Sequence, residues 1–96
     1  MPLKASQKKH LRTLCHHLRP IVTVAAKGLS GAVIAEIERA LADHELIKLK
    51  LRGDRGERAT WCASITAQCH AERIQSIGQV ACFYRRNPDK PVIDLP

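Results

Sequence analysis

One segment of the chain has residue types that could hold a phosphate group. It lies between a β-branched run and an amphipathic stretch and reads Val24-Ala25-Ala26-Lys27-Gly28-Leu29-Ser30-Gly31. Small side chains let a ligand approach the backbone, and Gly28 can adopt a positive φ angle. A helix that begins near Ser30 directs free N–H groups and the positive end of its dipole toward the same place. We therefore expect an anion site in this loop, with Lys27 as its cation.

The charge of the chain is strongly asymmetric. Sixteen Lys and Arg residues against nine Asp and Glu residues give a formal net charge of +7. Positions 1 to 35 contain no acidic residue, whereas they contain the basic residues Lys4, Lys8, Lys9, Arg12, Arg19 and Lys27. Such a charge can serve solubility alone, but its one-sided placement favours nucleic acid as the partner. With only Trp61, Phe83 and Tyr84 as aromatic residues, base stacking on an aromatic sheet is disfavoured.

The length of the chain sets its domain organisation. Ninety-six residues form one domain, residues 1–96, with a single core and no enclosed substrate cavity. The sequence shows no apolar run of the ~20 residues that span a bilayer and no secretion leader. We therefore expect a cytoplasmic monomer with no membrane and no small-molecule substrate as a partner.

The four cysteines raise the question of zinc. Cys15, Cys62, Cys69 and Cys82 show no pair with the two-residue gap that is typical of structural zinc sites. Each falls on the apolar side of a predicted helix or strand, where cysteine acts as a small hydrophobe. The sequence predicts reduced, buried thiols and no metal or other cofactor.

The N-terminal half of the chain predicts two helices and two strands. The first helix runs from Ser6, as N-cap, to Leu18 and buries Leu11, Leu14, Cys15 and Leu18. Its other side is a basic ridge of Lys8, Lys9, Arg12, His16 and Arg19. After Pro20, residues 21–24 form a short, largely buried strand. Ser30 caps a second helix that ends near His44 and buries Val33, Ile34, Ile37 and Leu41. Residues 46–51 alternate, which places Lys48 and Lys50 on one face of a strand; this face is either a basic binding surface or an ordinary solvated one.

The C-terminal half predicts a third helix and a hairpin. A turn covers residues 52–58, and a helix then runs to Ala71 and buries Cys62, Ile65, Thr66 and Cys69. Strands over 74–77 and 80–86 flank Gly78-Gln79, and the irregular tail 87–96 is docked through Val92, Ile93 and Leu95. The order α-β-α-β-α-β-β predicts an α/β two-layer sandwich with a mixed four-stranded sheet and right-handed crossovers.

Several segments are characteristic of one family when taken together: Leu11 to Val22, Lys27-Gly28-Leu29, Glu36 to Leu41, His44 to Lys50, Ile77-Gly78 and Tyr84-Arg85. With these segments the chain resembles, over nearly its whole length, the CRM domain family in its single-domain bacterial YhbY type. The resemblance implies a fold similar to the C-terminal domain of translation initiation factor three, preceded by an extra helix. It also implies an RNA-binding protein that associates with ribosomal RNA of the precursor large ribosomal subunit and assists its assembly.

The resemblance also implies where RNA is bound. The family's Gly-x-x-Gly loop grips the nucleotide backbone as KH domains do, and it maps to Ala25, Ala26, Lys27 and Gly28. Ala25 replaces the first glycine, so either position 25 has an ordinary backbone conformation or the loop differs from its relatives. The cations expected to assist the loop are Lys8, Lys9, Arg12, Lys48, Lys50 and Arg85.

Two other classes of function are considered beside RNA binding. An enzyme is disfavoured because no nucleophile–base motif, nucleotide-hydrolase phosphate loop or paired carboxylates can be identified, and His44 is better explained as a helix C-terminal residue. A protein-interaction module that binds a ribosomal protein or assembly factor is the alternative. It would use the acidic face of the second helix and the C-terminal tail.

Overall fold

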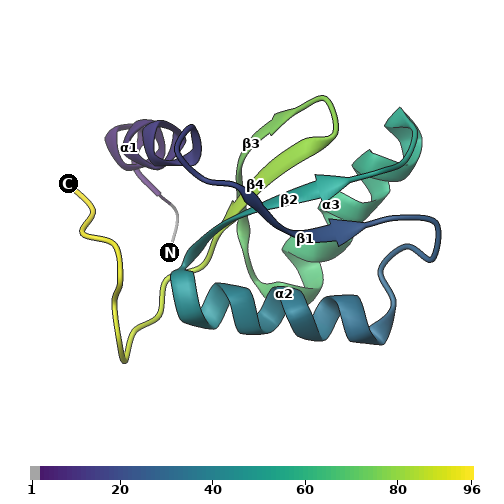
Figure 1. Cartoon of the computed structure of the whole chain (residues 1–96). Helices are drawn as coiled ribbons and strands as arrows, with labels where there is room; N and C mark the ends of the chain where they lie inside the picture. Colours follow the sequence, from purple (N-terminus) through teal and green to yellow (C-terminus); the bar gives the residue numbers. More distant parts are fainter. Residues whose placement is uncertain (1–2) are drawn as a thin grey trace.

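The computed structural model describes residues 3–96 and contains three helices and one four-stranded sheet (Figure 1). The elements are α1 Ala5–Cys15, β1 Pro20–Val24, α2 Gly31–His44, β2 Leu46–Leu51, α3 Arg55–Cys69, β3 Glu72–Ile77 and β4 Val80–Tyr84. The predicted order α-β-α-β-α-β-β and the mixed sheet are confirmed.

The strand order places three connections at one end of the sheet. The strands are ordered β1-β2-β4-β3, with β1 parallel to β2 and the other neighbours antiparallel. The carboxyl ends of β1 and β2 therefore lie beside the turn between β3 and β4. Backbone hydrogen bonds tie them together: Leu51 N–H donates to Gln79 C=O at 2.6 Å, and Arg52 N–H donates to Val24 C=O at 2.7 Å. We call this edge of the molecule the loop end.

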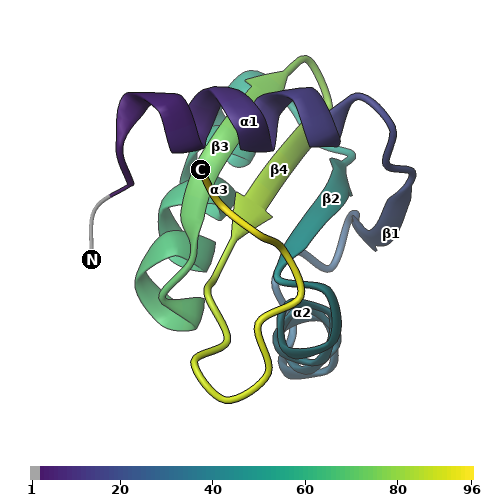
Figure 2. The same ribbon diagram turned by 90° about the vertical axis from the view of Figure 1, so that its left-hand side faces the viewer.

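The two faces of the sheet are covered differently. Helices α2 and α3 pack on one face, around a core that includes Ile37, Leu49, Ile65 and Phe83. Helix α1 and the C-terminal tail lie across the opposite face (Figure 2), where Leu11 is fully buried. The sheet with α2 and α3 forms the predicted two layers, and α1 adds a partial third. Lys48 and Lys50 point to the face under α1 and are half-buried, so this face is less open than predicted.

The bounds of α1 differ from the prediction at both ends. Its N-cap is Lys4 and not Ser6, because the N–H of Lys4 donates to the side chain of Gln7 at 2.9 Å. The helix ends at Cys15 and not at Leu18. The N–H groups of His17 and Leu18 bond to carbonyls three residues back, which tightens the chain into a turn before Pro20.

Helix α3 begins within the segment predicted as a turn. Asp54 and Glu57 form a capping box, with the N–H of Glu57 2.8 Å from Asp54 Oδ1 and the N–H of Asp54 3.0 Å from Glu57 Oε1. The helix therefore starts at Arg55. It ends at Cys69 rather than Ala71, and Thr66 is exposed, so its predicted burial is wrong.

The β3–β4 hairpin differs from the prediction in its bounds only. Strand β3 starts at Glu72, two residues earlier than predicted, and β4 ends at Tyr84 rather than Arg86. Gly78 lies in the turn with φ +55°, a conformation that glycine adopts without strain.

The tail beyond β4 is bound to the fold through a buried carboxylate. Glu45, between α2 and β2, is fully buried and has φ +63°. Its oxygens accept hydrogen bonds from the N–H groups of Asn87 at 2.6 Å and of Val92 and Ile93 at 2.7 Å. Burial alone would raise the pKa of Glu45, but these hydrogen bonds outweigh it and lower the pKa below the ordinary value of 4.5. The tail residues Ile93 and Leu95 pack beside α1, whereas Val92 is exposed, contrary to prediction.

Candidate nucleic-acid interface

The loop between β1 and α2 is a tight turn with an exposed cation. The N–H of Gly28 donates to Ala25 C=O at 2.7 Å, and Gly28 has φ +64°. Ala25 does not have a positive φ, so alanine fits this position with ordinary backbone geometry. Ala25, Ala26 and Lys27 are exposed. The loop thus offers small side chains, open backbone and one lysine to a ligand.

Helix α2 begins three residues after Gly28, so its N-terminal turn lies next to this loop. Ser30 is its N-cap, as predicted, and the Ser30 hydroxyl accepts a hydrogen bond from the N–H of Val33 at 3.3 Å. The N–H groups of Gly31 and Ala32 have no partner within the helix, because the first turn lacks preceding carbonyls. These donors and the helix dipole favour an anion on the loop side of the helix.

The indole ring of Trp61 packs against Gly28 of the loop and Gly53 of the following turn. A Cβ added at Gly28 would lie 3.4 Å from the indole Nε1, and one added at Gly53 would lie 2.7 Å from Cη2 of the same ring. Any larger residue at Gly53 would therefore displace the indole. The ring is 9% exposed and packs against both the loop and the 52–54 turn, so α3 fixes their relative positions.

Trp61 and the arginines near it were not predicted from the sequence as residues of the site. Arg52 and Arg55 are exposed at the loop end, and the guanidinium of Arg58 donates to Gly53 C=O at 2.7 Å. The spacing of Asp54 and Glu57 could have predicted where these arginines lie. This capping-box pattern starts a helix at Arg55 and brings Arg55 and Arg58, three residues apart, onto one face.

The cations of α1 lie apart from the loop, and those of β2 lie on the same face of the sheet as α1. Lys9 and Arg12 are exposed on α1, which covers the other face of the sheet (Figure 2). Lys8 is 3.6 Å from a carboxylate oxygen of Glu72 on β3. Lys48 and Lys50 are half-buried on the same face, and Lys50 pairs with Thr23 of β1 and Val80 of β4 near the loop end. The structure therefore places Lys8, Lys9 and Arg12 on α1, away from the loop, and Lys50 on the same face of the sheet but closer to the loop.

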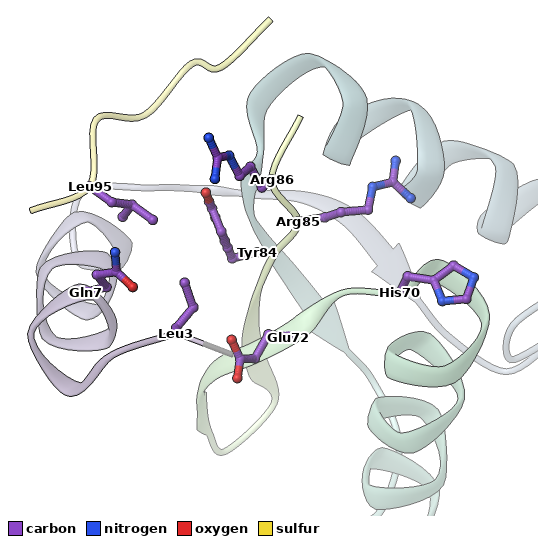
Figure 3. Close-up of a pocket in the computed structure, with 8 residues that line it drawn as sticks. All are labelled: Leu3, Gln7, His70, Glu72, Tyr84, Arg85, Arg86 and Leu95. Atoms are coloured by element: carbon purple, nitrogen blue, oxygen red, sulfur yellow. The ribbon is translucent and has the colours of Figure 1, made fainter. Parts of the chain in front are cut away.

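Arg85 is held by contacts within the protein. Its guanidinium is 2.6 Å from Glu38 Oε2 and also donates to the carbonyls of Cys69 at 3.0 Å and Glu38 at 3.3 Å. The hydrogen bond from the Arg85 guanidinium to the Glu38 carboxylate lowers the pKa of Glu38. In Figure 3, Arg85 points away from Tyr84 and Leu95. Arg85 thus joins the end of β4 to α2 and α3 and does not lie with the loop residues.

The recess in Figure 3 lies at the end of the sheet opposite the loop end. Its lining combines acidic, basic and apolar side chains: Leu3, Gln7, His70, Glu72, Tyr84, Arg85, Arg86 and Leu95. This mixture lacks the single charge sign of a phosphate-binding surface. It does not extend the loop site.

The cysteines are buried free thiols. A hydrogen bond with Cys82, together with burial, raises the pKa of Cys15, and burial with a bond to Glu38 raises the pKa of Cys69 to about 11. Both thiols are therefore protonated at neutral pH, and a protonated thiol is a poor nucleophile and metal ligand. Within residues 3–96, no three His, Cys, Asp or Glu side chains are grouped closely enough to hold a metal ion.

None of the helices in the described part of the chain has the length and apolar character needed to cross a bilayer.

An α/β fold with a small-residue loop at the start of α2 and with Lys27, Arg52 and Arg55 exposed near it is typical of a nucleic-acid-binding domain. Residues 3–85 match the CRS1/YhbY (CRM) domain, and the chain belongs to this family. The resemblance drawn from the sequence is therefore confirmed. Domains of this family are non-catalytic, so the prediction that the chain is not an enzyme is confirmed as well.

The chain is similar to bacterial proteins over most of its length. It is 46% identical over 89 residues to the "Probable RNA-binding protein PA4753" of Pseudomonas aeruginosa, covering 92% of this chain and 86% of that protein. It is 40% identical over 95 residues to an "RNA-binding protein" of Haemophilus influenzae, covering 98% and 95%. The solution structure of the hypothetical protein SAV1595 from Staphylococcus aureus matches with a TM-score of 0.83 and 27% identity, over 99% of this chain and 100% of that one.

Proposed function

We propose that this chain binds RNA without catalysis, by holding the nucleotide backbone at the loop Ala25–Gly28. The observation that carries the proposal is the exposed, lysine-bearing turn set against the N-terminus of α2 and supported by Trp61. Small side chains let a sugar-phosphate chain approach the backbone, and the free amides and Lys27 supply positive charge. The family and the names of the bacterial relatives support RNA as the nucleic acid.

The proposed RNA is ribosomal RNA of the precursor large subunit, whose assembly the protein would assist. Contacts to phosphate position an RNA without reading its sequence, so selectivity for this RNA would come from its shape and its unpaired nucleotides. Lys9 and Arg12 on the exposed side of α1 would bind further backbone, together with Lys8, Lys48 and Lys50. Crosslinking in cells followed by sequencing of the bound RNA tests this assignment. Crosslinks distributed without preference for large-subunit RNA would contradict it.

A protein partner is the second candidate. The acidic face of α2 remains open to one, since Glu36 and Asp43 are exposed. The tail is a poorer candidate, because three of its N–H groups are already bound to Glu45. RNase treatment of the complex isolated from cells separates the two functions: an RNA-dependent complex falls apart, and a protein-dependent one persists.

We expect the affinity for RNA to fall steeply as salt is added. Each neutralised phosphate releases condensed counterions and contributes a slope of roughly −0.7 to log K against log salt on single strands. The loop and the α1 cations together should give a slope of −2 or steeper. Titrating an unstructured RNA fragment at four or more salt concentrations measures it, and a slope near zero would remove the phosphate mechanism.

Replacing Ala25 with glycine tests the departure from the Gly-x-x-Gly pattern. Because Ala25 has an ordinary φ, its methyl group is not needed for the turn and can only stand between the backbone and the ligand. We expect Ala25→Gly to bind RNA as tightly as the parent or more tightly. Its free energy of unfolding should fall by about 0.5–1 kcal/mol, because glycine loses more backbone entropy on folding. Weaker RNA binding in a fully folded Ala25→Gly protein would mean that the methyl group itself contacts the RNA.

A further inference from the structure

A second basic surface lies between α3 and the edge strand β3. A shallow recess there extends from Arg73, near the start of β3, to Gly78 at the loop end, and Arg55 and Arg58 of α3 also line it. The hairpin residues Gln75, Ser76 and Gly78 form its far side. Among the described residues, no carboxylate lines this recess. Three arginines from two elements therefore face a common space without an acidic side chain to neutralise them.

The recess is joined to the Ala25–Gly28 loop by a continuous series of contacts. The Trp61 ring packs against both Gly28 and Gly53. The carbonyl of Gly53 accepts a hydrogen bond of 2.7 Å from Arg58, whose side chain is thereby held in place at the edge of the recess. In Figure 1 the start of α3, which follows this turn, and the β3–β4 hairpin both lie at the loop end. The recess and the loop are thus connected through Trp61, Gly53 and Arg58.

From this arrangement we infer that the Arg55–Arg58–Arg73 recess is a second phosphate-binding site, which holds a further stretch of the same RNA backbone bound at the loop. This inference rests on the proposed function. Arginine presents a planar fork of donors that fits phosphate oxygens, and Arg58 loses little freedom on binding because it is already positioned. Gln75 and Ser76 add neutral hydrogen-bonding groups beside the arginines.

The chemistry of the recess favours a phosphate chain over an acidic peptide. Within residues 3–96, its apolar lining consists only of Ala59, Cys62 and Ile74. Cys62 and Ile74 are almost fully buried, so a peptide would find little surface for side-chain anchors. Protein interfaces depend on such buried anchors, whereas binding to a nucleic-acid backbone depends mainly on charge.

The test compares two neutralising pairs in the full chain. Arg55→Gln with Arg73→Gln removes two charges from the recess and spares Arg58, which the fold uses. Arg39→Gln with Lys90→Gln removes the same charge from exposed positions elsewhere. We expect the recess pair to weaken binding of a single-stranded RNA about tenfold or more and to reduce the salt slope by about 1.4, since two phosphate contacts are lost. The control pair should change Kd less than about twofold.

Measuring Lys27→Glu in the same series separates this inference from the proposed function. If the recess pair binds and titrates like the control pair while Lys27→Glu is impaired, the recess is not an RNA site and the loop proposal stands. If only the recess pair is impaired, the recess binds RNA and the loop does not, which contradicts both the loop proposal and the inference that the two sites hold one backbone. A parent protein without salt-dependent RNA affinity contradicts both. Circular dichroism and melting temperatures of the variants confirm that each comparison is made between folded proteins.

Discussion

Lys27→Glu is expected to weaken RNA binding at least tenfold while leaving the protein folded. Lys27 is exposed at the tip of the Ala25–Gly28 turn, and its side chain makes no ion pair within residues 3–96. A charge-assisted contact to phosphate is worth about 1.5–3 kcal/mol, and a carboxylate in its place adds repulsion. Because no buried side chain changes, the melting temperature should stay within a few degrees of the parent value. Fluorescence anisotropy with a labelled RNA at moderate salt measures the loss.

The control for this variant is Lys90→Glu. It makes the same change of charge at another exposed lysine, in the tail and away from the loop end. Long-range repulsion would affect both variants similarly, whereas a direct contact affects Lys27→Glu alone. If the two variants bind RNA equally well, the loop is not the contact, and the basic surface of α1 around Lys9 and Arg12 becomes the better candidate.

The parts of the fold that follow local rules could be predicted from the sequence. Ser30 caps α2, the strand over residues 46–51 has its predicted bounds, and Gly28 has the positive φ that its place in the loop suggested. In each case the deciding interaction lies within a few residues of the chain. The start of α3 could also have been predicted, because Asp54 and Glu57 form its capping box. Gly53 and Gly56 instead led to the prediction of a longer turn.

The rest depends on residues far apart in the chain. Glu45 accepts hydrogen bonds from residues 42 to 48 positions later, and no local pattern marks it as a buried carboxylate. Arg85 was expected at the RNA surface. Its pairing with Glu38 could not be predicted, because it depends on the end of β4 lying beside α2. The arginine recess likewise exists only because α3 and β3 pack side by side. Periodicity predicts which face of an element is buried, but it does not predict which distant element covers that face.

Glu45→Gln is expected to destabilise the protein by about 2–3 kcal/mol, which for a domain of this size lowers the melting temperature by roughly 10 °C. Both carboxylate oxygens of Glu45 accept N–H groups of the tail, and a hydrogen bond to a charged group contributes about 1.5–3 kcal/mol. The glutamine side chain has the same shape, but it replaces one acceptor with an NH₂ group that faces an N–H donor. Hydrogen exchange should show the amides of Asn87, Val92 and Ile93 losing protection.

The pH dependence gives this prediction a second, independent readout. The pKa of Glu45 is lowered in the folded protein, so the carboxylate contributes its full stability above the ordinary value of 4.5 and loses it as the pH falls through the folded value. The difference in stability between the parent and Glu45→Gln should therefore be constant near neutral pH and narrow below about pH 4.5. Glu36→Gln, at an exposed position of α2, is the control and should follow the parent at every pH. If Glu45→Gln melts with the parent and keeps its tail amides protected, the tail is held by the packing of Ile93 and Leu95 instead of by the carboxylate.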